Sequence, residues 1–292
     1  MKITTDQLKG RQALSLEDKV AMTNQKIKQW YDYWNGNVYV AFSGGKDSTV
    51  LLHLVRSLYP EVPAVFCNTG LEYPEIVKFV KTIDNVTWLK PKKTFKRIIE
   101  EHGYPVISKE NSQKIYEIRT TKSEYLKNKR LYGDANGNGK LPKKWRYLID
   151  APFKISDRCC HIMKKGPSKK YEKLTGNKPF VGTMARDSAQ RQISYYKTGC
   201  NSFSKKRAMS LPIAFWLEED IWNCIKIEKL PYSSIYDMGY KNTGCMFCMF
   251  GAHLEKPVNK FQLMKKTHPK LYKYCMEKLN LHEVLTYCNV DH

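Results

Sequence analysis

Short apolar runs alternate with segments of helical spacing through the first third of the chain. Apolar side chains recur at near-helical spacing over residues 15–34, and Ser15 with Asp18 forms an N-terminal capping signal, so a helix is predicted there. Short β-rich apolar runs follow, separated by helical patterns at residues 47–58 and 73–83; the runs are residues 37–42, 63–67 and 85–89. Strands that alternate with helices at this spacing form parallel βαβ units. The pattern predicts an α/β fold with a doubly wound parallel sheet.

The middle of the chain departs from this alternation. Residues 109–154 are mainly basic and polar and contain a glycine-rich cluster, which predicts an insertion that is helical at first and then a loop. Further on, the spacing predicts a strand at residues 179–183, a helix at 218–229 and one or two terminal helices in 259–285. Three aromatic residues are expected in the core: Trp216, Trp222 and Tyr232. We divide the chain into a helical lead-in (1–36), an α/β domain with the insertion (37–240) and a cysteine-bearing C-terminal segment (241–292).

Residues 43–48 (SGGKDS) stand between the first predicted strand and the helix that follows it. At the carboxyl end of a parallel strand, glycines let the main chain wrap an anion, and the helix N-terminus adds positive potential. Gly44 and Gly45 leave space for the anion, and Ser43 and Ser48 add hydroxyl donors. Lys46 supplies a cation, and the carboxylate of Asp47 either holds Mg²⁺ or shapes the loop. We predict that this loop binds phosphate and is not an ordinary glycine turn.

Four of the nine cysteines form two close pairs. Cys159 and Cys160 are adjacent, and Cys245 and Cys248 form a Cys-x-x-Cys. Four thiolates in two such pairs hold either a tetrahedral zinc ion or an iron–sulfur cluster. Adjacent cysteines diverge in side-chain direction and suit a wide 4Fe-4S cluster better than zinc, with unligated thiols as the third alternative. The remaining internal cysteines lack partner spacing and are expected to be small core residues: Cys67, Cys200, Cys224 and Cys275.

Composition narrows the class of protein. In 292 residues, a 42% hydrophobic fraction suffices for a packed core and argues against a disordered or fibrous chain. No stretch is apolar enough to span a membrane, and the start of the chain lacks the apolar centre of a signal peptide, so we expect a soluble, cytoplasmic protein without a membrane partner.

The formal charge of +22 predicts acidic partners such as nucleotides or nucleic acid, although a solubilising surface explains this charge equally. Basic clusters beside aromatic residues, at 143–146 and 205–207, are compatible with single-stranded nucleic acid.

The SGGKDS loop resembles the PP-loop of ATP pyrophosphatases, which cleave between the α- and β-phosphates or bind an adenylyl nucleotide at that place. Three further segments are similar in order and spacing to the phosphoadenosine-phosphosulfate (PAPS) and adenylyl-sulfate reductase family: residues 68–75, 182–191 and 216–240. The paired cysteines resemble the cluster-binding pattern of the adenylyl-sulfate reductase branch and that of the DNA-phosphorothioation ATP pyrophosphatases. The resemblance does not cover the insertion or the C-terminal tail.

The resemblance implies an enzyme with two kinds of site. ATP or another adenylyl nucleotide, with Mg²⁺, would bind the loop together with Thr69, Gly70 and Gly182. A 4Fe-4S cluster would bind Cys159, Cys160, Cys245 and Cys248, its negative charge offset by Lys164 and Lys165, and a donor protein would supply sulfur or electrons. The implied catalytic residues are Lys46, Asp47, Arg186 and Arg191. The two arginines are five residues apart, so both would face an anion if their segment is helical.

The C-terminal tail departs from the family. Reductases that resemble this chain carry a nucleophilic cysteine in a Glu-Cys-Gly-Leu-His tail, whereas Cys288 lies in Tyr-Cys-Asn-Val with no neighbouring cation to activate it. This departure and the basic charge favour ATP-dependent sulfur modification of nucleic acid. The first alternative is reduction of adenylyl sulfate or PAPS with release of sulfite. The second is a nucleotide- and nucleic-acid-binding module without turnover, which the intact loop and paired cysteines disfavour.

Overall fold

The chain is organised in two compact units. The computed structural model describes residues 3–204 and 208–292, so the basic cluster at 205–207 lies outside the described residues. Unit 1 comprises Met1–Asn68, Tyr73–Lys90 and Pro167–Tyr236; unit 2 comprises Thr69–Glu72, Pro91–Gly166 and Asp237–His292. The division into domains 1–36, 37–240 and 241–292 stays a prediction.

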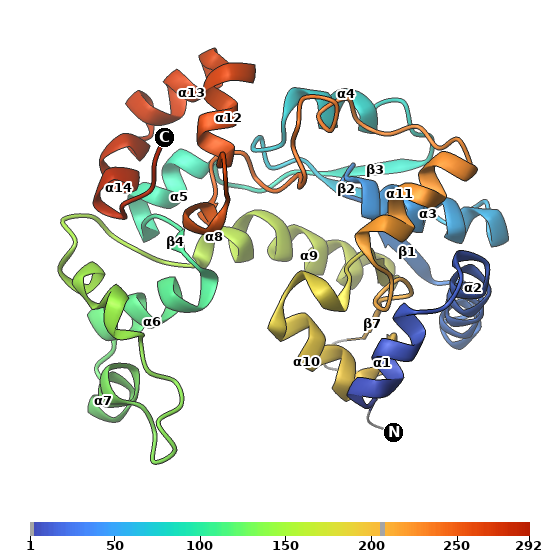
Figure 1. The fold of residues 1–292 in the computed structure, drawn as a ribbon, viewed down its shortest axis with the longest axis horizontal. Coiled ribbons are helices and arrows are strands. Elements are labelled where there is room, and N and C mark those ends of the chain that lie inside the picture. Colours follow the sequence, from blue (N-terminus) through green and yellow to red (C-terminus); the bar gives the residue numbers. More distant parts are fainter. Residues whose placement is uncertain (1–2, 205–207) are drawn as a thin grey trace. The chain divides into compact units, whose positions relative to one another are not determined.

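Unit 1 contains a six-stranded sheet with the strand order β3-β2-β1-β5-β7-β6. Figure 1 labels β1, β2, β3 and β7 of this sheet. Neighbouring strands are parallel except β7 and β6. The order reverses at β1, because β2 and β3 continue to one side and β5 begins the other; this is the doubly wound arrangement. The predicted α/β class is confirmed. The strands are β1 (Val38–Ala41), β2 (Ala64–Cys67), β3 (Val86–Leu89), β5 (Lys178–Val181), β6 (Asn201–Ser202) and β7 (Met209–Ser210).

The helices of unit 1 are held to the sheet by a buried core. They are α1 (Thr5–Gln12), α2 (Leu16–Tyr33), α3 (Lys46–Leu58), α4 (Pro74–Val80), α9 (Gly166–Thr175), α10 (Ala189–Thr198) and α11 (Glu218–Ile227). The side chain of Ser15 accepts a hydrogen bond from the amide of Asp18, as predicted for the start of α2. Trp216 is fully buried, as predicted, but Tyr232 is 39% exposed and the prediction for it was wrong. Its ring packs edge-on against Trp222 of α11, which is only half-buried and so does not belong to the core either.

A buried ion pair fastens α2 to α11. The ammonium of Lys19 donates to both carboxylate oxygens of Asp220 at 2.8 and 2.7 Å, and both residues are buried. Asp220 also accepts from the amide of Leu217 and so caps the helix that carries it. A buried charge left without its partner is costly, so removing either side chain would destabilise the contact between the two helices.

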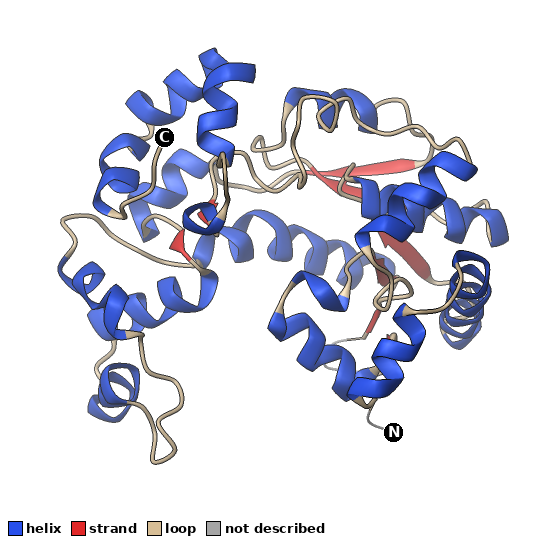
Figure 2. Ribbon diagram, in the orientation of Figure 1, coloured by secondary structure: helices blue, strands red, loops and turns tan. Residues whose placement is uncertain are grey.

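Unit 2 is mainly helical, as the predominance of blue ribbon in Figure 2 shows. Its helices are α5 (Phe95–His102), α6 (Lys109–Thr120), α7 (Glu124–Tyr132), α8 (Arg158–Cys160), α12 (Lys260–Thr267), α13 (Pro269–Lys273) and α14 (Leu281–Tyr287), with short 3₁₀ or π helices η1 (Lys143–Asp150), η2 (His161–Lys165), η4 (Ala252–Leu254) and η5 (Tyr274–Lys278). The terminal residues thus form more helices than the one or two expected. Parallel strands β4 (Val106–Ile107) and β8 (Met249–Phe250) pair with each other. Each of these strands has only two residues, which is too few for an alternation of apolar and polar side chains to predict a strand.

The predicted insertion is an ordered part of unit 2. It contains α6, α7 and η1 where only its first part was expected to be helical. The guanidinium of Arg119 in α6 donates to four main-chain carbonyls, those of Leu148, Ile149, Ala151 and Phe153, at 2.6 to 3.0 Å. One side chain therefore satisfies carbonyls in the last turn of η1 and in the residues that follow it. Within the described residues, no helix combines the length and apolar character needed to cross a membrane.

Candidate nucleotide and cysteine sites

The SGGKDS loop connects β1 to α3 in unit 1. Gly44 adopts a φ of +73°, and a Cβ built on it would lie 2.7 Å from Val80 Cγ2 and 2.9 Å from Ile76 Cγ2 of α4. Both the backbone conformation and the close approach of α4 therefore require glycine. On the other side of the strand-order reversal, a Cβ on Gly182 after β5 would lie 3.0 Å from the carbonyl oxygen of Asp47. The loop thus occupies the edge between β1 and β5, where open α/β sheets bind ligands.

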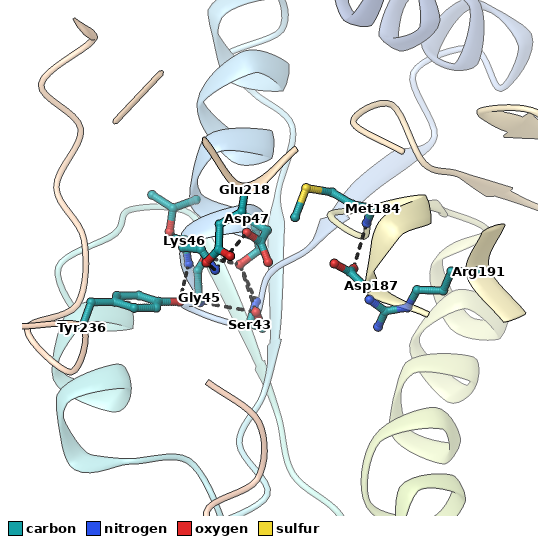
Figure 3. Close-up of polar contacts among 11 residues, drawn as sticks. Ser43, Gly45, Lys46, Asp47, Met184, Asp187, Arg191, Glu218 and Tyr236 are labelled. Carbon is teal, nitrogen blue, oxygen red and sulfur yellow. Dashed lines mark hydrogen bonds and ion pairs between the residues drawn. The ribbon is translucent and has the colours of Figure 1, made fainter. Parts of the chain in front are cut away.

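Side-chain oxygens already accept hydrogen bonds from the loop amides. The amide of Lys46 donates to the hydroxyl of Tyr236 at 2.8 Å, and the amide of Gly45 donates to the hydroxyl of Ser43 at 3.3 Å (Figure 3). Ser48 donates to the carbonyl of Gly45 at 2.9 Å and accepts from the amide of Ser43. These amides lie at the N-terminus of α3, where N–H groups have no partner within the helix. An oxygen of an anion is the ligand for which such amides are suited.

Charged side chains surround this helix N-terminus. The ammonium of Lys46 is buried, 3.6 Å from Asp47 Oδ1 and 3.3 Å from Glu218 Oε1. Burial alone lowers the pKa of Lys46, but Asp47, Tyr236 and Glu218 together outweigh it and raise that pKa above its usual value. Burial also raises the pKa of Asp47, against the opposing effect of Lys46 and with reinforcement from Asp187 and Glu218. Asp47 Oδ1 is buried and accepts no hydrogen bond from any described residue.

The segment after β5 is not one helix. Residues 185–187 form a 3₁₀ turn (η3, Ala185–Asp187), Ser188 is extended, and its hydroxyl accepts from the amide of Arg191 to cap α10. Asp187 accepts from the amide of Met184 at 3.0 Å and forms an ion pair with Arg191. Arg186 is exposed. The condition under which the two arginines would share one helical face is therefore not met, and their role as a pair stays a prediction.

Thr69 and Gly70, predicted to bind nucleotide by resemblance, belong to unit 2. Thr69 donates its amide to Glu72 at 2.9 Å and its hydroxyl to both Glu72 carboxylate oxygens, at 2.8 and 2.9 Å. Gly70 has a φ of +75°, and a Cβ added to it would meet nothing within 4 Å, so its conformation and not crowding selects glycine. Glu72, which sequence reasoning did not single out, organises this turn.

All four paired cysteines belong to unit 2. Cys159 and Cys160 lie in α8, which continues into the π helix η2, while a turn joins Cys245 and Cys248 through the amide of Cys248 and the carbonyl of Cys245 at 3.0 Å. A hydrogen bond between the first two thiols raises the pKa of Cys159 and lowers that of Cys160, and the charges of Cys245 and Cys248 raise that of Cys159 further. Burial raises the pKa of Cys248 to about 11. The four sulfurs therefore interact electrostatically although the two pairs are far apart in sequence.

A lysine lies against this cysteine group. Lys164 of η2 interacts with Cys245 and lies 3.6 Å from Glu72 Oε1, whose side chain is only 7% exposed. Burial lowers the pKa of Lys164, but Cys245, Glu72 and Cys160 raise it above its usual value on balance. Within residues 3–204 and 208–292, no three His, Cys, Asp or Glu side chains converge as ligands of a single metal ion. Cysteine thiolates are the ligand type that iron–sulfur clusters use.

The other cysteines behave as the sequence predicts, with one difference. Cys200, Cys224 and Cys275 are buried, whereas Cys67 is only half-buried. Cys288 is 3% exposed, and burial raises its pKa to about 12. A nucleophilic thiol needs a depressed pKa and an accessible sulfur. Cys288 has neither property in this structure.

A mainly parallel α/β sheet with a glycine-containing loop at its strand-order reversal defines a doubly wound fold, in which ligands bind at that edge of the sheet. The sequence model of the phosphoadenosine phosphosulfate reductase domain matches residues 37–133 and 112–250. The chain belongs to this family, and it is an enzyme of the family.

Individual relatives are distant. An uncharacterised protein of Methanocaldococcus jannaschii is 24% identical over 84% of this chain and 49% of its own length, so the chain spans about half of that relative. The adenosine 5'-phosphosulfate reductase of Geobacillus kaustophilus is 24% identical over 75% of each chain. The structure of the U34-tRNA thiolase of Methanococcus maripaludis with its [4Fe-4S] cluster aligns with a TM-score of 0.41 and 16% identity, over 90% of this chain and 78% of that one.

Proposed function

We propose that the chain activates an oxygen of a nucleic acid with ATP, releasing pyrophosphate, so that sulfur can replace that oxygen. The observation that carries the proposal is the loop at the β1–β5 edge, where two amides at the start of α3 donate to side-chain hydroxyls and Lys46 of the same turn carries a buried ammonium. Such a site neutralises the charge that develops on a leaving pyrophosphate. We assign the reaction to the cytoplasm.

The residues of unit 1 divide the work on the nucleotide. The amides of Gly45 and Lys46 would bind the pyrophosphate oxygens, which take the positions of the Ser43 and Tyr236 hydroxyls. The Lys46 ammonium would offset their charge. Asp47 fits a role in holding Mg²⁺, because its buried Oδ1 lacks a hydrogen-bond donor and Mg²⁺ is bound through one or two carboxylates together with phosphates. Arg186 and Arg191 follow β5 and are proposed to reach the nucleotide.

The cysteine group of unit 2 fits an iron–sulfur cluster. Cys159, Cys160, Cys245 and Cys248 would be its ligands, and Lys164 would offset its negative charge. When bound, such a cluster supplies a polarisable centre that handles a sulfur donor. A dedicated donor protein is the proposed source of that sulfur.

The proposed reaction balances without an oxidant. A carbonyl-type oxygen of the nucleic acid attacks the α-phosphorus of ATP, and the bond to the bridging oxygen breaks to release pyrophosphate. Hydrosulfide then attacks the activated carbon, AMP leaves with the original oxygen, and a proton is lost. Sulfur enters at its lowest oxidation state, so no electrons are exchanged.

Reduction of adenylyl sulfate is the second candidate, favoured by the reductase relatives. In this chain Cys288 is buried with a raised pKa, so a reductase would need another nucleophile. Two reaction mixtures distinguish these candidate functions. In the first, anaerobically purified protein is given radiolabelled ATP with nucleic acid, and in the second it is given adenylyl sulfate with a thiol. We expect AMP and pyrophosphate from the first mixture and no sulfite from the second. Sulfite without ATP cleavage would establish the reductase instead.

A further inference from the structure

Helix α7 and the segment that follows it expose aromatic side chains that no core covers. None of the residues of α7 is buried, and Tyr125 and Tyr132 are 73% and 68% exposed. These tyrosines are seven residues apart, or two helical turns, so they lie on one face. Figure 1 shows α7 and the loop after it extending beyond α6 within unit 2. We call residues 122–147 the arm.

The arm is strongly basic. It contains eight lysines and arginines against two acidic residues, Glu124 and Asp134. Four of its lysines are exposed: Lys122, Lys140, Lys143 and Lys144. The ammonium of Lys144 lies 5.1 Å from the centre of the Trp145 ring. One exposed lysine of the arm therefore lies against an aromatic ring.

Other polar groups of the arm hold it in place. Arg130 forms an ion pair with Glu117 of α6, and Arg146 donates to the carbonyl of Leu131. Lys114 of α6 donates to the carbonyl of Lys140 at 2.9 Å. Leu141 is fully buried, and its amide donates to the carbonyl of Arg130 at 2.7 Å. The arm is thus fastened by internal contacts, and its exposed lysines and tyrosines are left for another molecule.

We infer that the arm binds an unpaired strand of nucleic acid, with Tyr125 and Tyr132 stacking on bases and the exposed lysines contacting phosphates. Proteins that bind single strands combine a basic track with aromatic rings, because every base offers a face for stacking. Protein interfaces are depleted of lysine, so this lysine-rich surface fits a polyanion better than a protein partner. The inference rests on the proposed function and identifies where its acceptor is held.

Binding is tested without ATP, by fluorescence anisotropy of labelled single strands of about twelve nucleotides, oligo(U) and oligo(dT), against a duplex of equal length. We expect the single strands to bind more tightly than the duplex. Each Tyr→Ala change should weaken binding about tenfold, while Tyr125→Phe with Tyr132→Phe should retain it. The Lys143→Gln, Lys144→Gln pair should reduce the salt dependence by about 0.7 in log–log slope per lysine. The matched pair Lys9→Gln, Lys28→Gln removes the same charge from exposed positions of unit 1 and should leave the slope unchanged.

Two outcomes would overturn the inference: wild-type affinity in the Tyr125→Ala, Tyr132→Ala variant, or no binding of either single strand by the wild type. Thermal unfolding checks that the alanine variant is folded, which its exposed positions lead us to expect. Pyrophosphate release from ATP, measured separately, tests the proposed function. Single-strand binding that depends on the tyrosines, without ATP cleavage, would support strand binding by the arm and refute the proposed function. ATP cleavage together with binding that does not depend on the tyrosines would support the proposed function and refute strand binding by the arm.

Discussion

The two candidate sites are built in opposite ways. The nucleotide site of unit 1 is a contiguous six-residue loop whose principal donors are main-chain amides, with acidic side chains around a single buried ammonium. The cysteine site of unit 2 is assembled from side chains of two distant segments, with Lys164 placed against it. The first site depends on the local path of the backbone, and the second depends on the folding of a whole unit. Substitutions should therefore affect the two sites separately.

The largest effect is expected at Lys46. Lys46→Ala removes the buried ammonium beside the loop amides and should lower ATP turnover by about 10²–10³-fold, because it removes a preorganised charge from the leaving group. Bound iron should be unchanged. Lys28→Ala, at an exposed position of α2, is the matched control and should retain turnover. Full activity of Lys46→Ala would exclude it from catalysis.

The converse substitution is Cys245→Ser. Loss of one thiolate ligand should lower iron content, measured after anaerobic purification, by at least about tenfold. A single turnover of pyrophosphate release from ATP in the presence of nucleic acid, the step assigned to unit 1, should persist. Cys275→Ala alters another buried cysteine of unit 2 and should keep its iron. Equal iron in both variants would refute the ligand assignment.

Asp47→Asn should change catalytic turnover and the free energy of unfolding in opposite directions. Burial raises the pKa of Asp47, so the folded protein binds its proton more readily than the unfolded chain does, and the ionised carboxylate destabilises the fold at neutral pH. The variant should lose Mg²⁺-dependent turnover yet gain about 1 kcal/mol in the free energy of unfolding. That gain should shrink as the pH falls through the raised pKa of Asp47 towards about 4, where the unfolded carboxyl is protonated too. Urea unfolding at neutral and acidic pH measures it, and a variant less stable than the wild type at neutral pH would contradict the account.

The smallest effect is expected at Tyr236. Tyr236→Phe removes the hydroxyl that accepts from the Lys46 amide, so a nucleotide no longer has to displace it. Nucleotide affinity, measured by calorimetry, should rise about two- to tenfold, the net contribution of one hydrogen bond. Weaker binding would mean that the hydroxyl contacts the nucleotide directly.

The contrast between the sites also explains what the sequence could reveal. The SGGKDS loop was predictable because a buried strand, two glycines and a helix start are adjacent along the chain. The cysteine pairs were recognised from spacing and resemblance, although nothing local indicates that they meet. Tyr236 and Glu218 lie in the segment 216–240 that carries the resemblance, but their contacts with Lys46 were not predicted. Tyr236 is 190 residues from Lys46, and no local pattern indicates such a contact.

Longer-range structure escaped prediction in unit 2 as well. The strands β4 and β8 are too short to show a pattern, and their pairing joins residues 106 and 249. The basic insertion was expected to end in a loop, because its order comes from contacts such as those of Arg119 with four carbonyls. Hydrogen bonds from one arginine side chain to main-chain carbonyls about 30 residues away produce no hydrophobic periodicity in the sequence, so they could not be predicted from it. The same insertion supplies the exposed tyrosines of the arm.

The central claim is that nucleotide activation serves the transfer of sulfur to nucleic acid. It is tested most directly by incubating anaerobically purified protein with ATP, nucleic acid and radiolabelled sulfide. We expect label to enter the nucleic acid in proportion to the AMP formed, and to disappear in Lys46→Ala. AMP formation with no label in the nucleic acid, or label that enters without ATP, would contradict the account.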